Sequence, residues 1–120
     1  MTTILIALSA VACSGSPRTV EEWEASIWVP VSIDVPAPED ATSEVCETSL
    51  VKIREQIQSN SVAPDPELQE AFEKWLEAAQ SLTFECASDA EDFSYAESYA
   101  EVERLSEQID RILEDMGLAP

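Results

Sequence analysis

Apolar side chains recur at steps of three and four residues in three segments of the chain, which is the spacing of one helix face. The three stripes consist of Cys46, Leu50, Ile53 and Ile57, then Leu68, Phe72, Trp75, Ala79, Leu82 and Cys86, and finally Tyr95, Tyr99, Val102, Leu105, Ile109, Ile112 and Met116. Acidic residues occupy the remaining faces, so each segment predicts an amphipathic helix. We expect helices over about residues 39–59, 65–87 and 89–116, and an all-α fold in which residues 39–120 form a small three-helix bundle.

Residues typical of helix ends bound these segments. The stretch 60–66 breaks the pattern, and within it Asp65 is suited to cap the second helix and Pro66 to occupy its first position. Residues 88–91 have the form of a capping box and predict the start of the third helix. Gly117 is suited to end that helix.

The positions of Cys46 and Cys86 predict how the first two helices pair. Both cysteines lie on the apolar stripes, and the midpoint between them falls at residue 66, inside the break. Two antiparallel helices joined at this point would bring the cysteines side by side, close enough for the Cα separation of about 4.4–6.8 Å that a disulfide requires. We therefore expect a helical hairpin that is pinned by a Cys46–Cys86 disulfide.

The segment before the bundle, residues 16–38, follows a different pattern. Its alternating apolar residues are Ile27, Val29, Val31, Ile33 and Val35. A period of two is typical of a strand, and Pro30 would place such a strand at a sheet edge, so we expect an extended N-terminal arm. The arm either lies along the bundle in a groove between helices or adds to a sheet edge of a partner.

Three tryptophans bear on this choice. Trp75 lies on the second helical stripe and is expected in the core. Trp23 and Trp28 lie in the arm, where they could pack on the bundle, meet a bilayer interface or anchor a partner. We take both as candidate partner-binding residues.

The amino terminus carries a short apolar run. Residues 4–12 are uncharged, with small residues at Ala10 and Ala12, and Cys13 follows directly. Nine residues are too few to cross a hydrocarbon layer of about 30 Å, but they suit the apolar region of a signal peptide. The stretch resembles the lipobox of bacterial lipoproteins. This resemblance implies a signal peptide over 1–12, lipidation of Cys13 and a tether over 13–38.

The composition narrows the functional classes. Twenty-five acidic residues stand against six basic ones, for a net charge of −19, which repels nucleic acid and favours a basic partner. Histidine, the commonest general base and the commonest zinc ligand, is absent, and with only two glycines the chain has no Gly-rich phosphate-binding loop. We therefore expect no enzyme activity, no cofactor, no nucleic acid partner and no small-molecule substrate.

The odd number of cysteines fits the resemblance, because lipidation of Cys13 leaves Cys46 and Cys86 to pair. The leading hypothesis is a lipid-anchored structural or interaction protein on the extracytoplasmic face of a cell membrane or outer membrane. One alternative is a Ca²⁺-binding module, for which the weak metal candidates are Glu85, Asp89, Glu91 and Asp92. Another is an acidic inhibitor that mimics nucleic acid and binds a basic protein.

Overall fold

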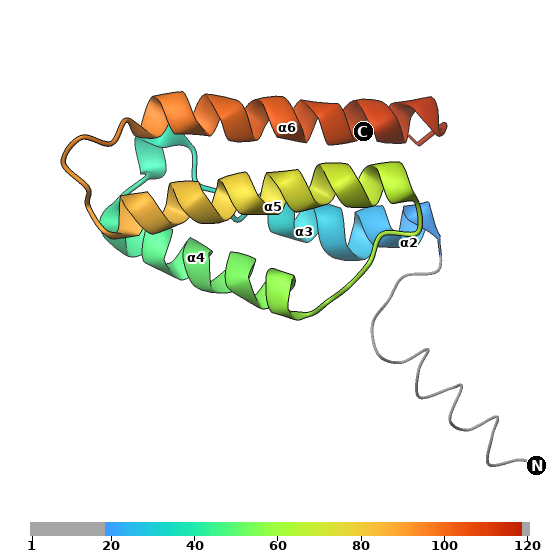
Figure 1. The fold of residues 1–120 in the computed structure, drawn as a ribbon, viewed down its shortest axis with the longest axis horizontal. Coiled ribbons are helices and arrows are strands. Elements are labelled where there is room, and N and C mark those ends of the chain that lie inside the picture. Colours follow the sequence, from blue (N-terminus) through green and yellow to red (C-terminus); the bar gives the residue numbers. More distant parts are fainter. Residues whose placement is uncertain (1–18, 119–120) are drawn as a thin grey trace, which may run out of the picture.

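The structure, a computed structural model, describes residues 19–118. The expected signal peptide and Cys13 lie outside these residues. The described part contains helices and turns but no strand, so the all-α fold class is confirmed. Its three long helices are α4 (Ser43–Gln58), α5 (Pro66–Ala87) and α6 (Tyr95–Asp115). As Figure 1 shows, α5 runs antiparallel to both α4 and α6 and packs against each of them.

Side chains cap the N-terminus of each long helix. Thr42 accepts a hydrogen bond from the Val45 amide at 3.1 Å and so begins α4. Asp65 accepts from the Leu68 amide at 3.1 Å and begins α5, as its sequence position indicates. At the other end of the chain, Gly117 has a φ of +85° and ends α6.

Two expected helix starts are wrong. The first long helix begins at Ser43 rather than near residue 39, because residues 38–40 form a separate 3₁₀ turn, η2 (Pro38–Asp40). The third begins at Tyr95 rather than residue 89, with Ser94 accepting a hydrogen bond from the Glu97 amide at 3.4 Å. The predicted capping box at 88–91 instead lies in the turn that ends α5.

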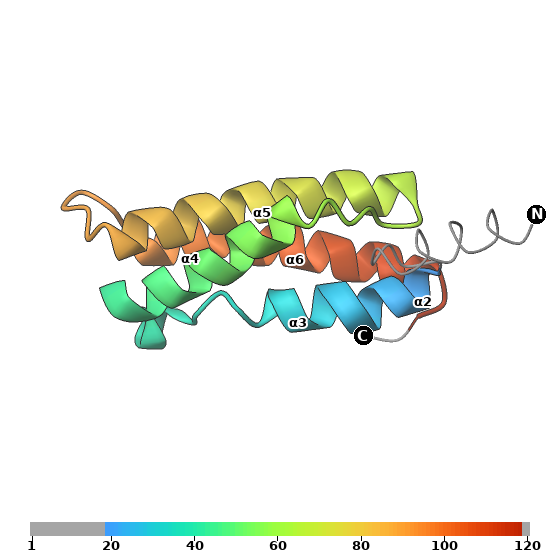
Figure 2. The same cartoon turned by 90° about the horizontal axis from the view of Figure 1, so that it is seen from below.

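The segment before the bundle is helical rather than extended. It consists of α2 (Val20–Trp23), a π-helical turn η1 (Glu24–Trp28) and α3 (Val29–Ser32). Figures 1 and 2 together show it lying along the bundle and facing α5 from the other side of the core. Of the two arrangements considered for this segment, the structure shows the one along the bundle, whereas the expected extended conformation is wrong.

The alternating apolar pattern has a helical explanation. Ile27, Val31 and Val35 are spaced four residues apart and are buried, whereas Val29 and Ile33 have the same spacing and are exposed. Two helical stripes displaced by two residues produce the same sequence pattern as a strand with a period of two. The sequence alone therefore does not distinguish the two conformations.

The π-helical turn precedes a proline. In an α-helix the ring of Pro30 would clash with the carbonyl group of Ser26, and Pro30 has no amide hydrogen to donate. The chain widens just before this point, so that the Val29 amide donates to the Glu24 carbonyl, five residues back. The wider turn accommodates the proline without ending the helix.

An aromatic cluster joins this segment to α5. Trp23 and Trp28 contact Phe72 edge to face, with ring centroids 5.1 and 6.2 Å apart respectively, and Trp28 contacts Trp75 in the same way at 5.1 Å. All four side chains are buried. Aromatic pairs in this arrangement stabilise a core beyond the area that they bury. The cluster therefore makes the N-terminal segment part of the fold.

Candidate functional site

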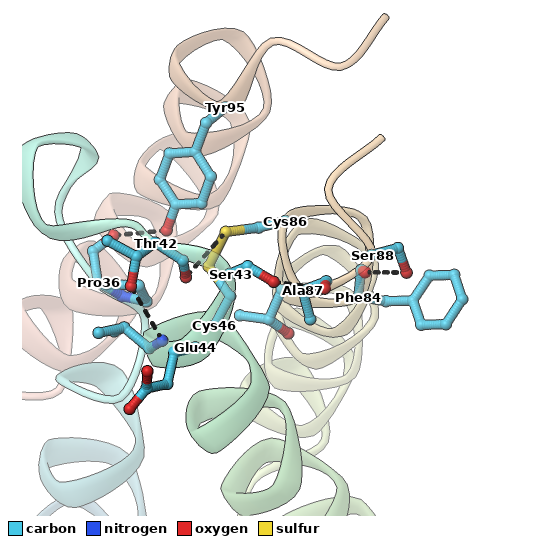
Figure 3. Close-up of a disulfide and its surroundings, with 12 residues drawn as sticks. Pro36, Thr42, Ser43, Glu44, Cys46, Phe84, Cys86, Ala87, Ser88 and Tyr95 are labelled. Carbon is cyan, nitrogen blue, oxygen red and sulfur yellow. Dashed lines mark hydrogen bonds between the residues drawn. A yellow bond between two sulfur atoms is a disulfide. The ribbon is translucent and has the colours of Figure 1, made fainter. Parts of the chain in front are cut away.

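The Cys46–Cys86 disulfide joins the start of α4 to the end of α5 (Figure 3), as predicted. Its Cα atoms are 5.8 Å apart, and Cys46 is fully buried. Ser43 adds a second link between these helices, since its hydroxyl donates to the Ala87 carbonyl at 2.7 Å. The bridge therefore closes the open end of the α4–α5 hairpin.

Tyr95 extends this end of the bundle to α6. Its hydroxyl donates to the Pro36 carbonyl at 2.6 Å, which ties the first turn of α6 to the linker that follows α3 (Figure 3). Burial, together with a smaller contribution from the neighbouring Tyr99, raises the pKa of Tyr95 to about 12. The hydroxyl thus remains a neutral donor at ordinary pH.

The four acidic metal candidates lie around the turn between α5 and α6. Asp89 has a φ of +55°. Its amide donates to the Cys86 backbone carbonyl at 3.1 Å, and the Ala90 amide donates to the Glu85 backbone carbonyl at 3.4 Å. This is the Schellman arrangement that ends a helix, usually with glycine at this position. Asp89 therefore ends α5 and does not cap α6.

The structure brings these carboxylates to neighbouring surfaces without gathering them into a ligand set. Glu85, Glu91 and Asp92 line an open depression of about 490 Å³, whereas Asp89 lines the adjoining one of about 170 Å³. Within residues 19–118, no three acidic or cysteine side chains lie close enough together to hold a metal ion.

Trp23 and Trp28 are buried, so in this structure neither indole ring is exposed to a partner or a bilayer. In this arrangement the two rings are part of the core rather than of a partner contact. The Trp28 indole Nε1–H donates to the Asp110 carboxylate on α6 at 3.1 Å. Of the three roles considered for these tryptophans, the structure supports packing on the bundle.

A surface groove, called the α3–α4 groove below, lies between α4 and residues 33–36, which directly follow α3. Ile33 and Val45 face an open groove of about 330 Å³, with Asp34, Glu44 and Lys52 also among its lining residues. Ile33 is 77% exposed. The sequence feature that could have indicated exposed apolar residues here is the spacing of Val29 and Ile33 by one helical turn. The interpretation as a strand did not separate these two residues from the buried ones.

The charges on the described surface are mostly uncompensated. Within residues 19–118 the ion pairs join Lys52 to Asp34 at 3.8 Å and Arg104 to Glu101 at 2.7 Å. Burial raises the pKa of Asp34, and Lys52 partly offsets this effect. The surface therefore offers many carboxylates that lack a cationic partner within the described chain.

None of the helices within residues 19–118 is both long and apolar enough to span a membrane. Comparison with known proteins gives no match to a family model, a curated protein sequence or a solved structure.

Proposed function

We propose that this protein is a small exported lipoprotein that holds an acidic helical bundle at the outer face of a membrane and serves as a protein-interaction unit. The observation that carries the proposal is the Cys46–Cys86 disulfide. Disulfides persist in oxidising compartments outside the cytoplasm and are rare inside it. A disulfide that joins two elements of the core therefore supports an exported protein.

The disulfide also leaves the third cysteine, Cys13, without a partner cysteine in the chain. With Cys46 and Cys86 paired, Cys13 is the remaining thiol of the chain, and it directly follows the apolar run over residues 4–12. In an exported protein an unpaired cysteine calls for a specific role. Lipidation after cleavage of the leader supplies that role. A single acyl chain binds a membrane only weakly, so stable anchoring needs the multiple acylation that the lipobox resemblance implies.

The chain length between anchor and fold restricts where the bundle would sit. Thr19, which caps α2, is six residues after Cys13. Six extended residues span at most about 22 Å, so an anchored bundle stays close to the membrane surface. Its net charge of −19 is repelled by anionic lipid headgroups, which leaves the acidic faces available to other proteins.

The acidic surface favours a basic partner over other binding classes. A strong negative charge repels nucleic acid, whose phosphates carry the same sign. It attracts proteins with basic patches and accelerates their encounter. The proposed role is therefore structural or adaptor-like, and requires no catalytic step.

The anchoring is tested by intact mass spectrometry of the protein extracted from membranes of its host. We expect a mature chain that begins at Cys13 and carries the added mass of its acyl groups. Cys13→Ala should release the protein or leave it unprocessed, whereas Cys86→Ala, which also removes one thiol, should leave it on the membrane. An unmodified chain that begins at Met1, with free thiols at Cys46 and Cys86, would contradict the proposal.

A further inference from the structure

The helical segment before the bundle presents apolar residues on two sides. One side packs into the core through Trp23, Trp28 and Val31. The other carries Val29, which is 51% exposed, and Ile33, one turn later. Exposed aliphatic residues at this spacing form a short ridge that nothing in the described chain covers.

The opposite wall of the α3–α4 groove, formed by α4, also carries an exposed apolar residue. Val45, which is 40% exposed, lies on the opposite side of the groove from the end of α3. Small polar side chains, Thr48 and Ser49, line the groove between them. The groove thus combines aliphatic walls with a polar lining, which suits one inserted apolar side chain better than an extended apolar surface.

The charges at the rim indicate the chemistry of the partner. The side chain of Asp34 is partly buried, and its ion pair with Lys52 is long at 3.8 Å. Burial therefore raises the pKa of Asp34 despite this cation. Glu44, on the other rim, has no ion pair within residues 19–118. A cationic side chain of a partner placed at this rim would therefore meet carboxylates that the described chain pairs weakly or leaves without an ion pair.

We propose that the groove between α3 and α4 docks a basic amphipathic helix of another protein, with an apolar side chain inserted between Ile33 and Val45 and a lysine or arginine at the rim. In the helix-in-groove mode an amphipathic helix places apolar anchors in a groove of its partner, and complementary charges around the contact favour the encounter. A second copy of this chain is disfavoured as occupant by mutual repulsion at a net charge of −19. The inference rests on the proposed interaction role but does not depend on lipidation.

The test uses the full chain with Cys13→Ser, so that no lipid is attached, labelled with ¹⁵N and with the disulfide formed. The probe is a synthetic helical peptide of leucine and lysine, with leucines spaced three and four residues apart. We expect its chemical-shift changes to concentrate around Ile33, Val45 and Lys52, and its affinity to fall as salt is raised.

A pair of variants with equal charge change separates groove binding from general attraction. Ile33→Glu should weaken peptide binding by about tenfold or more, because it places a charge at the centre of the contact. Val51→Glu adds the same charge at a 54% exposed position of α4 that does not line the groove, and should change the affinity by less than about twofold. Both positions are exposed, so neither variant is expected to prevent folding.

Four results would overturn the docking proposal. The first is equal weakening of peptide binding by the two variants, and the second is equally strong binding of a leucine–glutamate peptide. The third is a set of chemical-shift changes that map to another face or to residues 1–18. The fourth is chemical-shift changes at the groove when zwitterionic lipid vesicles are added in place of the peptide. Because the tested chain carries no lipid, a negative result here leaves the anchoring proposal standing. Failure of lipidation at Cys13 would likewise leave a positive result at the groove unaffected.

Discussion

Trp23 and Trp28 stack with their ring planes 2° apart and their centroids 6.3 Å apart, although they are separated by five positions in the chain. In an α-helix, residues at this spacing point about 140° away from each other around the axis. A π-helical turn is wider, with hydrogen bonds from residue i to residue i+5, and so brings a residue and the one five positions later to the same side of the helix. The turn at Glu24–Trp28 is therefore what directs both indole rings into the core.

Removing the indole nitrogen of Trp28 should weaken the attachment of the N-terminal segment to α6. Trp28→Phe deletes the hydrogen bond to Asp110, leaves that carboxylate without its donor and also reduces the size of a buried ring in the aromatic cluster. We expect a loss of about 1–3 kcal/mol in the free energy of unfolding, measured by urea denaturation. Asp110→Asn keeps an acceptor oxygen and should cost less. Equal stability of Trp28→Phe and the parent chain would show that the hydrogen bond contributes nothing.

The disulfide should supply a large part of the stability. Cys46 and Cys86 are 40 positions apart, and opening a loop of this length costs about 4 kcal/mol in the chain-entropy model. The double variant Cys46→Ala/Cys86→Ala should lose about this amount in denaturant unfolding, and the parent chain under reducing conditions should match it. Cys13→Ala serves as the control and should unfold like the parent. A double variant as stable as the parent would contradict this account.

The hydroxyl of Tyr95 should make stability fall at alkaline pH. Its pKa is about 12 in the folded chain against an ordinary value of 10.0 for tyrosine, so the unfolded chain releases this proton first. The contribution of the group is therefore fully present below pH 10 and is lost as the pH rises through about 12. Thermal unfolding across this window should show a steeper decline for the parent than for Tyr95→Phe, which also loses about 1 kcal/mol at neutral pH with the bond to Pro36. Parallel pH profiles would contradict this assignment.

The hairpin could be predicted from the sequence because two independent patterns agree on it. The stripes that contain Cys46 and Cys86 have regular helical spacing, and the break at Asp65 lies midway between them. Each pattern alone would have left the pairing open. Together they specify both the orientation of the helices and their register, and the disulfide confirms both.

The start of α6 was mispredicted because the sequence contains two capping patterns of the same form. Ser88 and Glu91 match the pattern, and so do Ser94 and Glu97. The first pair is unavailable because the residues that follow α5 are used to end that helix, with Asp89 in a left-handed conformation. Competition between two helix ends for the same residues does not show in either local pattern.

The α3–α4 groove could not be predicted because it depends on tertiary packing. Ile33 and Val45 are far apart in any helical or strand pattern, and they lie on the same groove only once α3 has packed beside α4. The π-helical turn that orients α3 also has no periodic signal of its own. Only Pro30 marked the position as irregular, and it favoured a strand edge equally well.

The left-handed conformation of Asp89 gives a prediction that separates backbone from side chain. Asp89→Gly removes the carboxylate but tolerates a φ of +55°, so the Schellman turn that ends α5 should persist and the free energy of unfolding should rise by up to about 1 kcal/mol. Asp89→Ala removes the same carboxylate but is strained at this φ, and should lower the free energy by about 1 kcal/mol. Urea denaturation of the two variants beside the parent measures both effects. Equal losses in the two variants would mean that the carboxylate, rather than the backbone conformation, accounts for aspartate at this position.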